Sequence, residues 1–273
     1  MRKLTPIQRK QFQNKVWKFY KENKRDFPWR KSLSTYRIVL SELMLQQTQV
    51  SRVEIKFKEF LKTFPNFTSL ANAPFRDVLR VWQGMGYNRR AKYLKSSAEI
   101  VVQKYNKRLP RDPEILKTLP GIGPNTAGSI CAFAFNKPVV FIETNIRSVF
   151  IHEFFKNKNN IDDAQLLPLI EQTLDTKNPR EWYSALMDYG TWIKQQTTNP
   201  NRKSKHHTKQ STFKGSDREI RGKILKSLTQ QNNLTQNYII KKLDENPERV
   251  GTILSQLEKE DLIKKNKNRY TIS

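Results

Sequence analysis

Apolar residues recur with the 3.6-residue period of an α-helix along most of the chain before residue 195. Short polar breaks, several marked by proline, separate the apolar stretches, and the alternation that predicts β-strands is absent from them. The pattern therefore predicts an all-α domain of packed helices over residues 1–194. The expected helices span residues 8–22, 35–46, 52–63, 75–82, 89–105, 113–118, 126–135, 144–155, 164–174 and 179–194.

A different pattern begins near residue 216. Apolar stripes predict a helix at Asp217–Thr229, a second helix capped by Thr235 and a third that begins at Pro247. Two short strands then flank the basic turn Lys264–Arg269. This order is typical of a winged helix-turn-helix, a small α+β domain expected over residues 216–273, although winged helices also serve protein contacts. The residues expected on the outward face of the third helix, the candidate recognition helix, are Arg249, Thr252, Ser255, Gln256 and Lys259.

Residues 195–215 join the two expected domains and are rich in Gln, Thr, Asn, Lys and Ser. Such a composition predicts a basic linker rather than a folded element. A solvated tether is the favoured interpretation. A segment that becomes ordered on a phosphate backbone remains the alternative.

The chain is strongly basic, with 51 Lys and Arg against 25 Asp and Glu and a formal net charge of +26 over 273 residues. The excess runs through both halves, so it forms a body-wide field that attracts polyanions, and nucleic acid is the favoured partner. No apolar run approaches the ~18 residues of a membrane-spanning helix, and no apolar signal core follows Met1. We therefore expect no membrane partner and a cytoplasmic location, associated with the nucleoid in a prokaryote.

Cys131 is the single cysteine and lies in an apolar helical stretch, which favours a buried thiol. One thiol excludes a disulfide framework and an iron–sulfur cluster, and three histidines without cysteine partners make a poor zinc site. We therefore expect no metal and no cofactor, with a monovalent cation at the glycine-rich turn described next left open. Nothing in the pattern indicates an oligomer, and a monomer is expected.

The stretch from residue 119 to residue 130 contains a turn in which Gly121 and Gly123 flank one apolar residue. Glycine permits positive φ and lets backbone N–H groups approach an anion, and a helix expected to begin at Thr126 would add its positive end. The alternative is an ordinary turn between two core helices. Because Glu143 follows shortly afterwards, a phosphate clamp is combined with an acid, which indicates chemistry on DNA.

Five ordered segments carry a resemblance to a known family. From about Gln11 to Lys194 the chain resembles the helix-hairpin-helix DNA glycosylase superfamily, and within it most closely the MutY adenine glycosylases. The eleven-residue block at 40–50 is the most specific of the segments. They are Asp-Phe-Pro-Trp-Arg at 26–30, Leu-Ser-Glu-Leu-Met-Leu-Gln-Gln-Thr-Gln-Val at 40–50, Leu-Ala-Asn-Ala-Pro at 70–74, Trp-Gln-Gly-Met-Gly-Tyr at 82–87, and residues 119–128.

Enzymes of this superfamily flip a nucleotide out of the duplex before they cut its glycosidic bond. Glu42 lies among apolar neighbours, where desolvation would raise its pKa and keep it protonated as a general acid. The resemblance implies that Glu42 protonates the departing purine. A carboxylate on a helix surface is the alternative.

A second carboxylate is needed because positive charge builds on the sugar as the bond breaks. The resemblance assigns this role to Glu143, where MutY enzymes carry Asp within Asp-Gly-Asn. The extra methylene would misplace the carboxylate, an error that can cost ~100-fold in rate, although Thr144 in place of Gly would compensate by withdrawing the backbone. Asn145 matches the family and would position the sugar or the water.

Asn125 occupies the hairpin position at which bifunctional relatives such as endonuclease III carry a lysine nucleophile. Asparagine cannot form a Schiff base, so the resemblance implies a monofunctional glycosylase that leaves an abasic site. Asn125 would either contact the sugar or the acid, or cap the helix.

Further residues take their expected roles from the same segments. The base pocket is expected to include Arg25, Phe27, Trp29 and Leu45. Amide side chains on the helix of Glu42 would meet base edges, and an aromatic wedge would enter the gap left by the flipped base. The expected DNA contacts are Gln46, Gln47, Thr48, Gln49, Tyr87, Gly121, Gly123 and Thr126.

Three departures from the MutY pattern bear on the substrate. Asn88 replaces a second family tyrosine, the cluster thiolates expected from about Lys194 are absent, and a winged helix stands where the domain that reads oxidised guanine would be. The favoured substrate is adenine opposite guanine or 8-oxoguanine in double-stranded DNA. The alternatives are another mismatched or damaged base, such as thymine or uracil opposite guanine or hypoxanthine, and a DNA-binding protein without catalysis.

Overall fold

The computed structural model describes residues 3–208 and 211–273, which form two compact units. Unit 1 combines the described residues up to Val39, Pro110–Thr118, and the stretch from Ile122 to residue 208. Unit 2 combines Leu40–Leu109, Leu119–Gly121 and residues 211–273. Helix α2 (Thr35–Leu45) begins in the first unit and ends in the second. No helix in the described ranges is long and apolar enough to cross a membrane.

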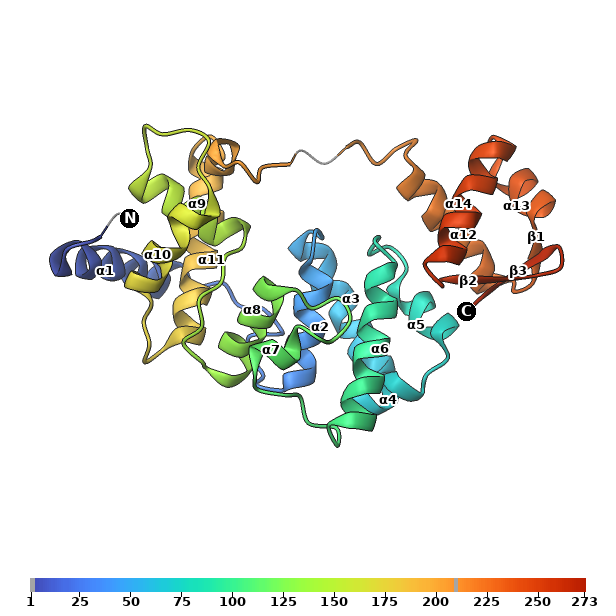
Figure 1. Cartoon of the computed structure of the whole chain (residues 1–273), viewed down its shortest axis with the longest axis horizontal. Helices are drawn as coiled ribbons and strands as arrows, with labels where there is room; N and C mark the ends of the chain where they lie inside the picture. The colour runs from blue at the N-terminus through green and yellow to red at the C-terminus, as the bar shows by residue number, and fades with distance from the viewer. Residues whose placement is uncertain (1–2, 209–210) are drawn as a thin grey trace. The chain divides into compact units, whose positions relative to one another are not determined.

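Unit 1 is helical, and its core forms around the long helix α11, which packs against α1, α8 and α9. Aromatic rings join three of these helices, because the ring of Phe12 lies 5.3 Å from that of Phe150 and 6.0 Å from that of Trp182. The apolar faces predicted from the 3.6-residue period thus pack together into one hydrophobic core. The elements of unit 1 in Figure 1 are α1 (Pro6–Asn23), α7 (Pro113–Leu116), α8 (Pro124–Phe135), α9 (Thr144–Phe154), α10 (Asp163–Thr173), α11 (Pro179–Gln196) and the 3₁₀ helix η1 (Pro200–Lys203).

The first part of unit 2 adds four helices to the end of α2. Phe60 and Trp82 are buried against each other, with ring centroids 5.9 Å apart. The helices are α3 (Val50–Thr63), α4 (Phe67–Asn72), α5 (Phe75–Trp82) and α6 (Arg89–Lys104). Although the four-residue α7 falls within the predicted stretch 113–118, the six-residue α4 is absent from the predicted set. Its start is nevertheless encoded by a capping box between Asn66 and Ser69.

The second part of unit 2 has the predicted winged-helix order of three helices and a ribbon. The predicted helices and the Thr235 cap are confirmed, and the strands extend into the basic turn further than expected. A short additional strand, β1, completes a three-stranded antiparallel sheet of order β1-β3-β2. The elements are α12 (Asp217–Gln230), β1 (Leu234–Thr235), α13 (Gln236–Leu243), α14 (Pro247–Lys259), β2 (Ile263–Asn266) and β3 (Arg269–Ile272). The all-α class with a small α+β winged-helix domain is confirmed.

The winged helix packs against the rest of unit 2 through α12, which lies beside α5 (Figure 1). The Nε of Arg76 on α5 donates to the backbone oxygen of Thr229 at 3.0 Å. On α6 the ammonium of Lys92 donates to the backbone oxygens of Glu260 and Asp261 at 3.1 and 2.9 Å. Arginine and lysine side chains thereby bind backbone oxygens near the ends of α12 and α14.

Part of the segment expected to be a solvated tether is folded onto unit 1. The side chain of Asn201 in η1 is buried, and its Nδ2 donates to the backbone oxygen of Thr144 at 2.9 Å and to the hydroxyl of Ser148 at 2.6 Å. The composition that predicted a tether misses these contacts because one buried amide is enough to anchor the turn. Residues 209 and 210 of the predicted linker lie outside the described residues.

Candidate active site and DNA-binding surface

Glu143 caps the N-terminus of α9, at the position that the sequence predicts for the second carboxylate. Its Oε1 accepts from the backbone N–H groups of Asn145 and Ile146 at 2.8 and 2.9 Å, and its Oε2 accepts from the Asn145 amide at 3.1 Å. Both carboxylate oxygens are thus held by α9 itself, so a single rotamer is fixed.

The surroundings of Glu143 have opposing effects on its pKa. Burial raises the pKa of Glu143, while the two backbone N–H donors and the charges of Lys194 and Arg147 act in the opposite direction and do not fully offset it. Burial likewise lowers the pKa of Lys194, which Glu143 counteracts. A buried carboxyl with a shifted pKa is a candidate functional group, and the role of Glu143 in stabilising a positive charge stays a prediction.

Asn145 is positioned from the neighbouring helix α11. The hydroxyl of Thr191 donates to the Asn145 Oδ1 at 3.3 Å, and one residue earlier Gly190 touches the Asn145 backbone. A Cβ at Gly190 would lie 2.2 Å from the Asn145 oxygen, so only glycine permits this approach of α11 to α9. The position of Asn145 therefore depends on the spacing of two helices.

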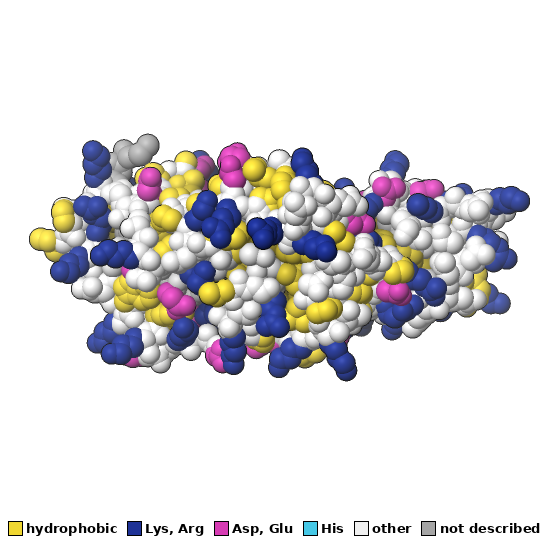
Figure 2. Space-filling view, turned by 90° about the horizontal axis from the view of Figure 1, so that it is seen from below, with side chains coloured by type: hydrophobic (Ala, Val, Ile, Leu, Met, Phe, Trp, Pro, Cys, Tyr) yellow, Lys and Arg dark blue, Asp and Glu magenta, His cyan; other side chains and the backbone are white. Residues whose placement is uncertain are grey.

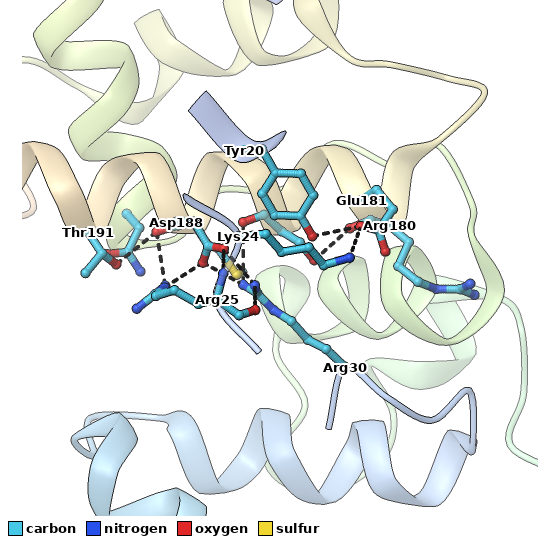
Figure 3. A network of polar contacts seen from close by, with 11 residues as sticks. Tyr20, Lys24, Arg25, Arg30, Arg180, Glu181, Asp188 and Thr191 are labelled. Atoms are coloured by element: carbon cyan, nitrogen blue, oxygen red, sulfur yellow. Dashed lines mark hydrogen bonds and ion pairs between the residues drawn. The ribbon is translucent and has the colours of Figure 1, made fainter. Parts of the chain in front are cut away.

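One turn earlier on α11, the buried Asp188 binds two arginines of the segment after α1 (Figure 3). Its carboxylate accepts from the Arg25 backbone N–H and Nε at 3.0 and 2.7 Å, and from both terminal nitrogens of Arg30 at 2.8 and 2.9 Å. Two bound guanidiniums compensate the charge of the buried Asp188 carboxylate. Asp188 therefore holds the segment after α1 in place.

The same segment carries the rings predicted for the base pocket. Phe27 stacks on Trp29 with centroids 5.0 Å apart and an interplanar angle of 14°, and the guanidiniums of Arg25 and Arg30 lie 5.0 and 5.1 Å from the Phe27 ring. Unit 1 therefore brings Arg25, Phe27 and Trp29 together, while the fourth predicted pocket residue, Leu45, belongs to unit 2. Arg25 is held by Asp188, which no sequence motif singles out.

The hairpin turn differs in detail from the prediction. Gly121 has the expected positive φ, +77°, and a Cβ there would lie 2.8 Å from the side chain of Tyr93, whereas Gly123 has a φ of −84° that any residue adopts. Helix α8 begins at Pro124, so the prediction that Thr126 starts the helix is wrong by two residues, because proline favours the first helical position.

Asn125 is likewise not the cap of this helix, since Gly123 occupies that position. The Oδ1 of Asn125 accepts from the backbone N–H of Ile142 at 3.2 Å. The alternative in which Asn125 caps the helix is therefore wrong, and its side chain instead ties α8 to the residue before Glu143. A contact with the sugar stays a prediction.

Glu42 lies on α2, within the part of that helix that belongs to unit 2. Its side chain is half-buried, and its neighbours Ser41, Leu43 and Met44 are almost completely buried. The residues beside Glu42 along the helix thus belong to the buried part of unit 2, and the apolar surroundings of its side chain stay a prediction. Its catalytic role stays a prediction.

The predicted DNA contacts Gln46, Gln47, Thr48 and Gln49 do not lie on the helix of Glu42. Helix α2 ends at Leu45, and these residues form the turn before α3, because Gln47 takes a left-handed φ of 54°. The Gln46 amide donates to the Gly121 backbone oxygen at 3.2 Å and joins this turn to the hairpin. Non-glycine residues at positive φ are uncommon and cluster at functional sites.

Arg90 on α6 holds this turn and is a residue that the sequence patterns do not reveal. Its buried guanidinium donates to the backbone oxygens of Leu43 and Met44, both at 2.8 Å, and to the Thr48 hydroxyl at 2.9 Å. It also donates to the backbone oxygen of Gly86 at 3.2 Å. Burial lowers the pKa of Arg90 to about 10. The Arg90 guanidinium therefore supplies hydrogen bonds to backbone oxygens at the end of α2 and in the loop before α6.

Tyr87, the predicted wedge, is at the end of that loop and has a left-handed φ of 43°. Its side chain is partly exposed, and its ring lies 5.5 Å from the Arg90 guanidinium. The wedge and the Gln46–Gln49 turn are thus connected through Arg90 within one unit. The face drawn in Figure 2 carries scattered Lys and Arg side chains, with fewer acidic ones.

Comparisons with known proteins agree with this architecture. Residues 40–171 match the family described as HhH-GPD superfamily base excision DNA repair protein. The adenine DNA glycosylase of Buchnera aphidicola subsp. Baizongia pistaciae (strain Bp) is 37% identical over 172 residues, which cover 62% of this chain and 49% of that protein. The chain spans about half the length of the curated relatives that it matches.

Solved structures show the same fold. A thermostable thymine-DNA glycosylase superposes with a TM-score of 0.63 and 27% identity, covering 71% of this chain and 91% of that one. A non-covalent endonuclease III–DNA complex superposes with a TM-score of 0.53 and 18% identity, covering 70% of this chain and 86% of that one. The fold is that of a helix-hairpin-helix DNA glycosylase. Residues 40–171 match the HhH-GPD superfamily, and the curated relatives that this part of the chain resembles are MutY-like adenine DNA glycosylases.

Proposed function

We propose that this protein is a monofunctional DNA glycosylase of base excision repair that flips a mispaired purine from duplex DNA and hydrolyses its N-glycosidic bond. The proposed base is adenine opposite guanine or 8-oxoguanine, because the curated relatives are adenine DNA glycosylases. The observation that carries the proposal is that the family-matched stretch, residues 40–171, contains both Glu42 and Glu143. The net charge of +26 supports binding to the phosphate backbone.

In the proposed reaction Glu42 donates a proton to the purine, and the electrons of the bond between C1′ and the base leave with the base. The Glu143 carboxylate, held by Asn145 and Ile146, stabilises the positive charge that develops on the sugar. A water molecule then adds to C1′ and gives its proton to a carboxylate of the site, which leaves an abasic sugar. Asn145 positions the sugar or the water.

The reaction as proposed uses no metal or cluster and no amine nucleophile. Asn125 in the hairpin cannot form a Schiff base with the sugar, so strand cleavage requires a later step. The chain has one cysteine, and the segment after α11 is anchored by the Asn201 amide rather than by thiolate ligands. We propose that the protein acts as a monomer in the cytoplasm.

Thymine opposite guanine is a second candidate substrate. A thermostable thymine-DNA glycosylase is 27% identical to this chain, and the match covers 91% of that protein. The two substrates place different demands on Glu42, since protonation of a ring nitrogen assists the departure of a purine in particular.

The experiment is an excision assay on labelled duplexes that carry A:G, A:8-oxoguanine, T:G, U:G or hypoxanthine:T, each with and without alkali. We expect strand breaks at adenine that require alkali and that fall by about 100-fold to 10,000-fold in Glu42→Gln, the range typical of a lost general acid. Excision of thymine alone would favour the second candidate. Binding without excision of any base would contradict the glycosylase proposal.

A further inference from the structure

A pocket of about 380 Å³ lies within unit 2, where α12 of the winged helix faces the two turns that carry the predicted DNA contacts. Its volume falls in the range of sites that hold a small ligand or a single nucleotide. The residues that bear on its chemistry are Gln46, Gln47, Tyr87 and Arg89 from the turns and Arg218 and Arg221 from α12. Side chains from opposite ends of the sequence therefore share one site.

Arg218 connects the winged helix to the wedge. Its Nη1 donates to the Tyr87 hydroxyl at 3.1 Å, and its guanidinium carbon lies 5.9 Å from the Tyr87 ring. Its Nη2 donates to the Ser211 backbone oxygen at 2.6 Å, so the guanidinium is itself anchored. With Arg90 5.5 Å from the ring as well, Tyr87 is held by two cations and by a left-handed backbone.

The charge of the pocket selects the class of ligand. Among the described residues that line it, four are arginines, namely Arg89, Arg90, Arg218 and Arg221, and one is a carboxylate, Glu260, which pairs with Arg221. The remaining excess of positive charge favours an anion. An aromatic face and amide side chains beside that charge provide stacking and base-edge contacts, the combination that binds nucleotides of DNA.

We propose that α12 of the winged helix forms one wall of a binding site for a single nucleotide of duplex DNA, in which Arg218 positions Tyr87 for stacking. This inference rests on the proposed function, because it takes the bound polymer to be the DNA whose base is excised. Arg218 is a positioning residue in this site. The winged helix thereby takes part in recognition of the lesion through α12, in addition to any contact made by its recognition helix α14 or its wing.

The test measures binding of the full-length chain to a duplex with a tetrahydrofuran abasic analogue opposite 2-aminopurine, and to the same duplex without the lesion. Arg218→Gln removes the bond to Tyr87, and Lys223→Gln is the matched control. Lys223 carries the same charge on the same helix and lies five residues from Arg218, on the side away from Arg218 and Arg221. Thermal unfolding of each variant shows whether it is folded.

We expect Arg218→Gln to weaken binding of the lesion duplex by about 10-fold, which corresponds to the loss of one charge-assisted hydrogen bond. Lys223→Gln should change the affinity for the two duplexes equally and only slightly. The 2-aminopurine fluorescence should change on binding of the wild type and change less with Arg218→Gln, because stacking on Tyr87 is lost. Arg218→Lys should be intermediate, since an ammonium keeps the charge but not the planar fork.

Equal effects of Arg218→Gln and Lys223→Gln on both duplexes, with unchanged fluorescence, would overturn the inference. Because the analogue has no base to remove, this result does not depend on which base is excised. A chain that excises no base but shows the Arg218 effect would contradict the proposed function and leave the nucleotide site standing.

Discussion

In the proposed reaction Glu143 stabilises the sugar cation as a carboxylate, yet burial raises its pKa. The folded protein therefore binds this proton more tightly than the unfolded chain does. The free energy of unfolding falls as the pH rises from the unfolded pKa of a glutamate, about 4.3, through the raised folded pKa, and it stays lower above that. Ionisation of the buried Glu143 carboxyl therefore costs the folded protein stability relative to an unperturbed glutamate.

Glu143→Gln should accordingly be more stable than the wild type at pH 7 and lose that advantage at about pH 3, where the Glu143 carboxyl is protonated in both the folded and the unfolded chain. The Gln oxygen can still accept from the two backbone N–H groups, and the Asn145 amide can turn over because the Thr191 hydroxyl can also accept. Thermal unfolding at the two pH values measures this, and about 2–4 °C is expected for each kcal/mol.

The same variant should lose excision by about 100-fold to 1,000-fold, the effect of one lost electrostatic group in a catalytic site. Glu143→Asp, which keeps the charge, is the control and should retain most of the pH dependence of stability. A Glu143→Gln protein that is less stable than the wild type at pH 7 would show that the hydrogen bonds at the α9 cap outweigh the burial of the charge.

At the scale of elements, the position of Asn145 depends on the contact between α9 and α11. Gly190→Ala would place a Cβ 2.2 Å from the Asn145 backbone oxygen, so the helices must separate. We expect a destabilisation of roughly 1–3 kcal/mol from overpacking and a loss of excision rate of about 100-fold, since a displacement near 1 Å misplaces Asn145 and Glu143. Denaturant unfolding and single-turnover kinetics measure the two effects.

Gly222→Ala is the matched control for this prediction. Gly222 also lies within a helix, α12, and a Cβ at this position would have no heavy atom of the described residues within 4 Å beyond its own helix and chain neighbours. Alanine there should therefore stabilise the protein by roughly 0.5–1 kcal/mol. If Gly190→Ala behaved like Gly222→Ala, the close approach of α9 and α11 would not be what positions Asn145.

Most of the helices that the sequence predicts show a periodic apolar face, and even the four-residue α7 falls within the predicted stretch 113–118. Helix α4, with six residues, and strand β1, with two, were missed. The end of α2 was predicted to within one residue, but the placement of Gln47 and Gln49 on that helix was wrong, because their turn is held by Arg90, which lies on α6 and binds backbone oxygens. Such a contact between distant segments leaves no local signal in the sequence.

The residues of the candidate site likewise divide into those with a signal in the sequence and those without one. Glu42, Glu143 and Tyr87 could be named because they lie in segments that resemble a family. Asp188 and Arg218 could not, since an acid on a long helix and an arginine of a basic domain are ordinary in sequence. Both residues are distinguished by partners more than 130 positions away in the chain, and Asp188 is buried as well.

At the scale of the whole molecule, the question is whether the charge of +26 acts as a diffuse field or through particular phosphate contacts. The wing, formed by β2, β3 and the turn that joins them, carries Lys264, Lys265 and Lys267, all exposed. Helix α1 offers a matched set of three exposed lysines, Lys10, Lys18 and Lys21. Neutralising either set to glutamine changes the net charge by the same amount.

A diffuse field predicts that both triple variants lower the affinity for duplex DNA equally. Contacts predict a difference, because each phosphate that a lysine neutralises contributes about 0.9 to the slope of log affinity against log salt concentration. We expect the wing variant to lower that slope by roughly two to three and the α1 variant to leave it nearly unchanged. Equal slopes would make the wing a part of the general field and leave α12 and α14 as the candidate DNA contacts of the winged helix.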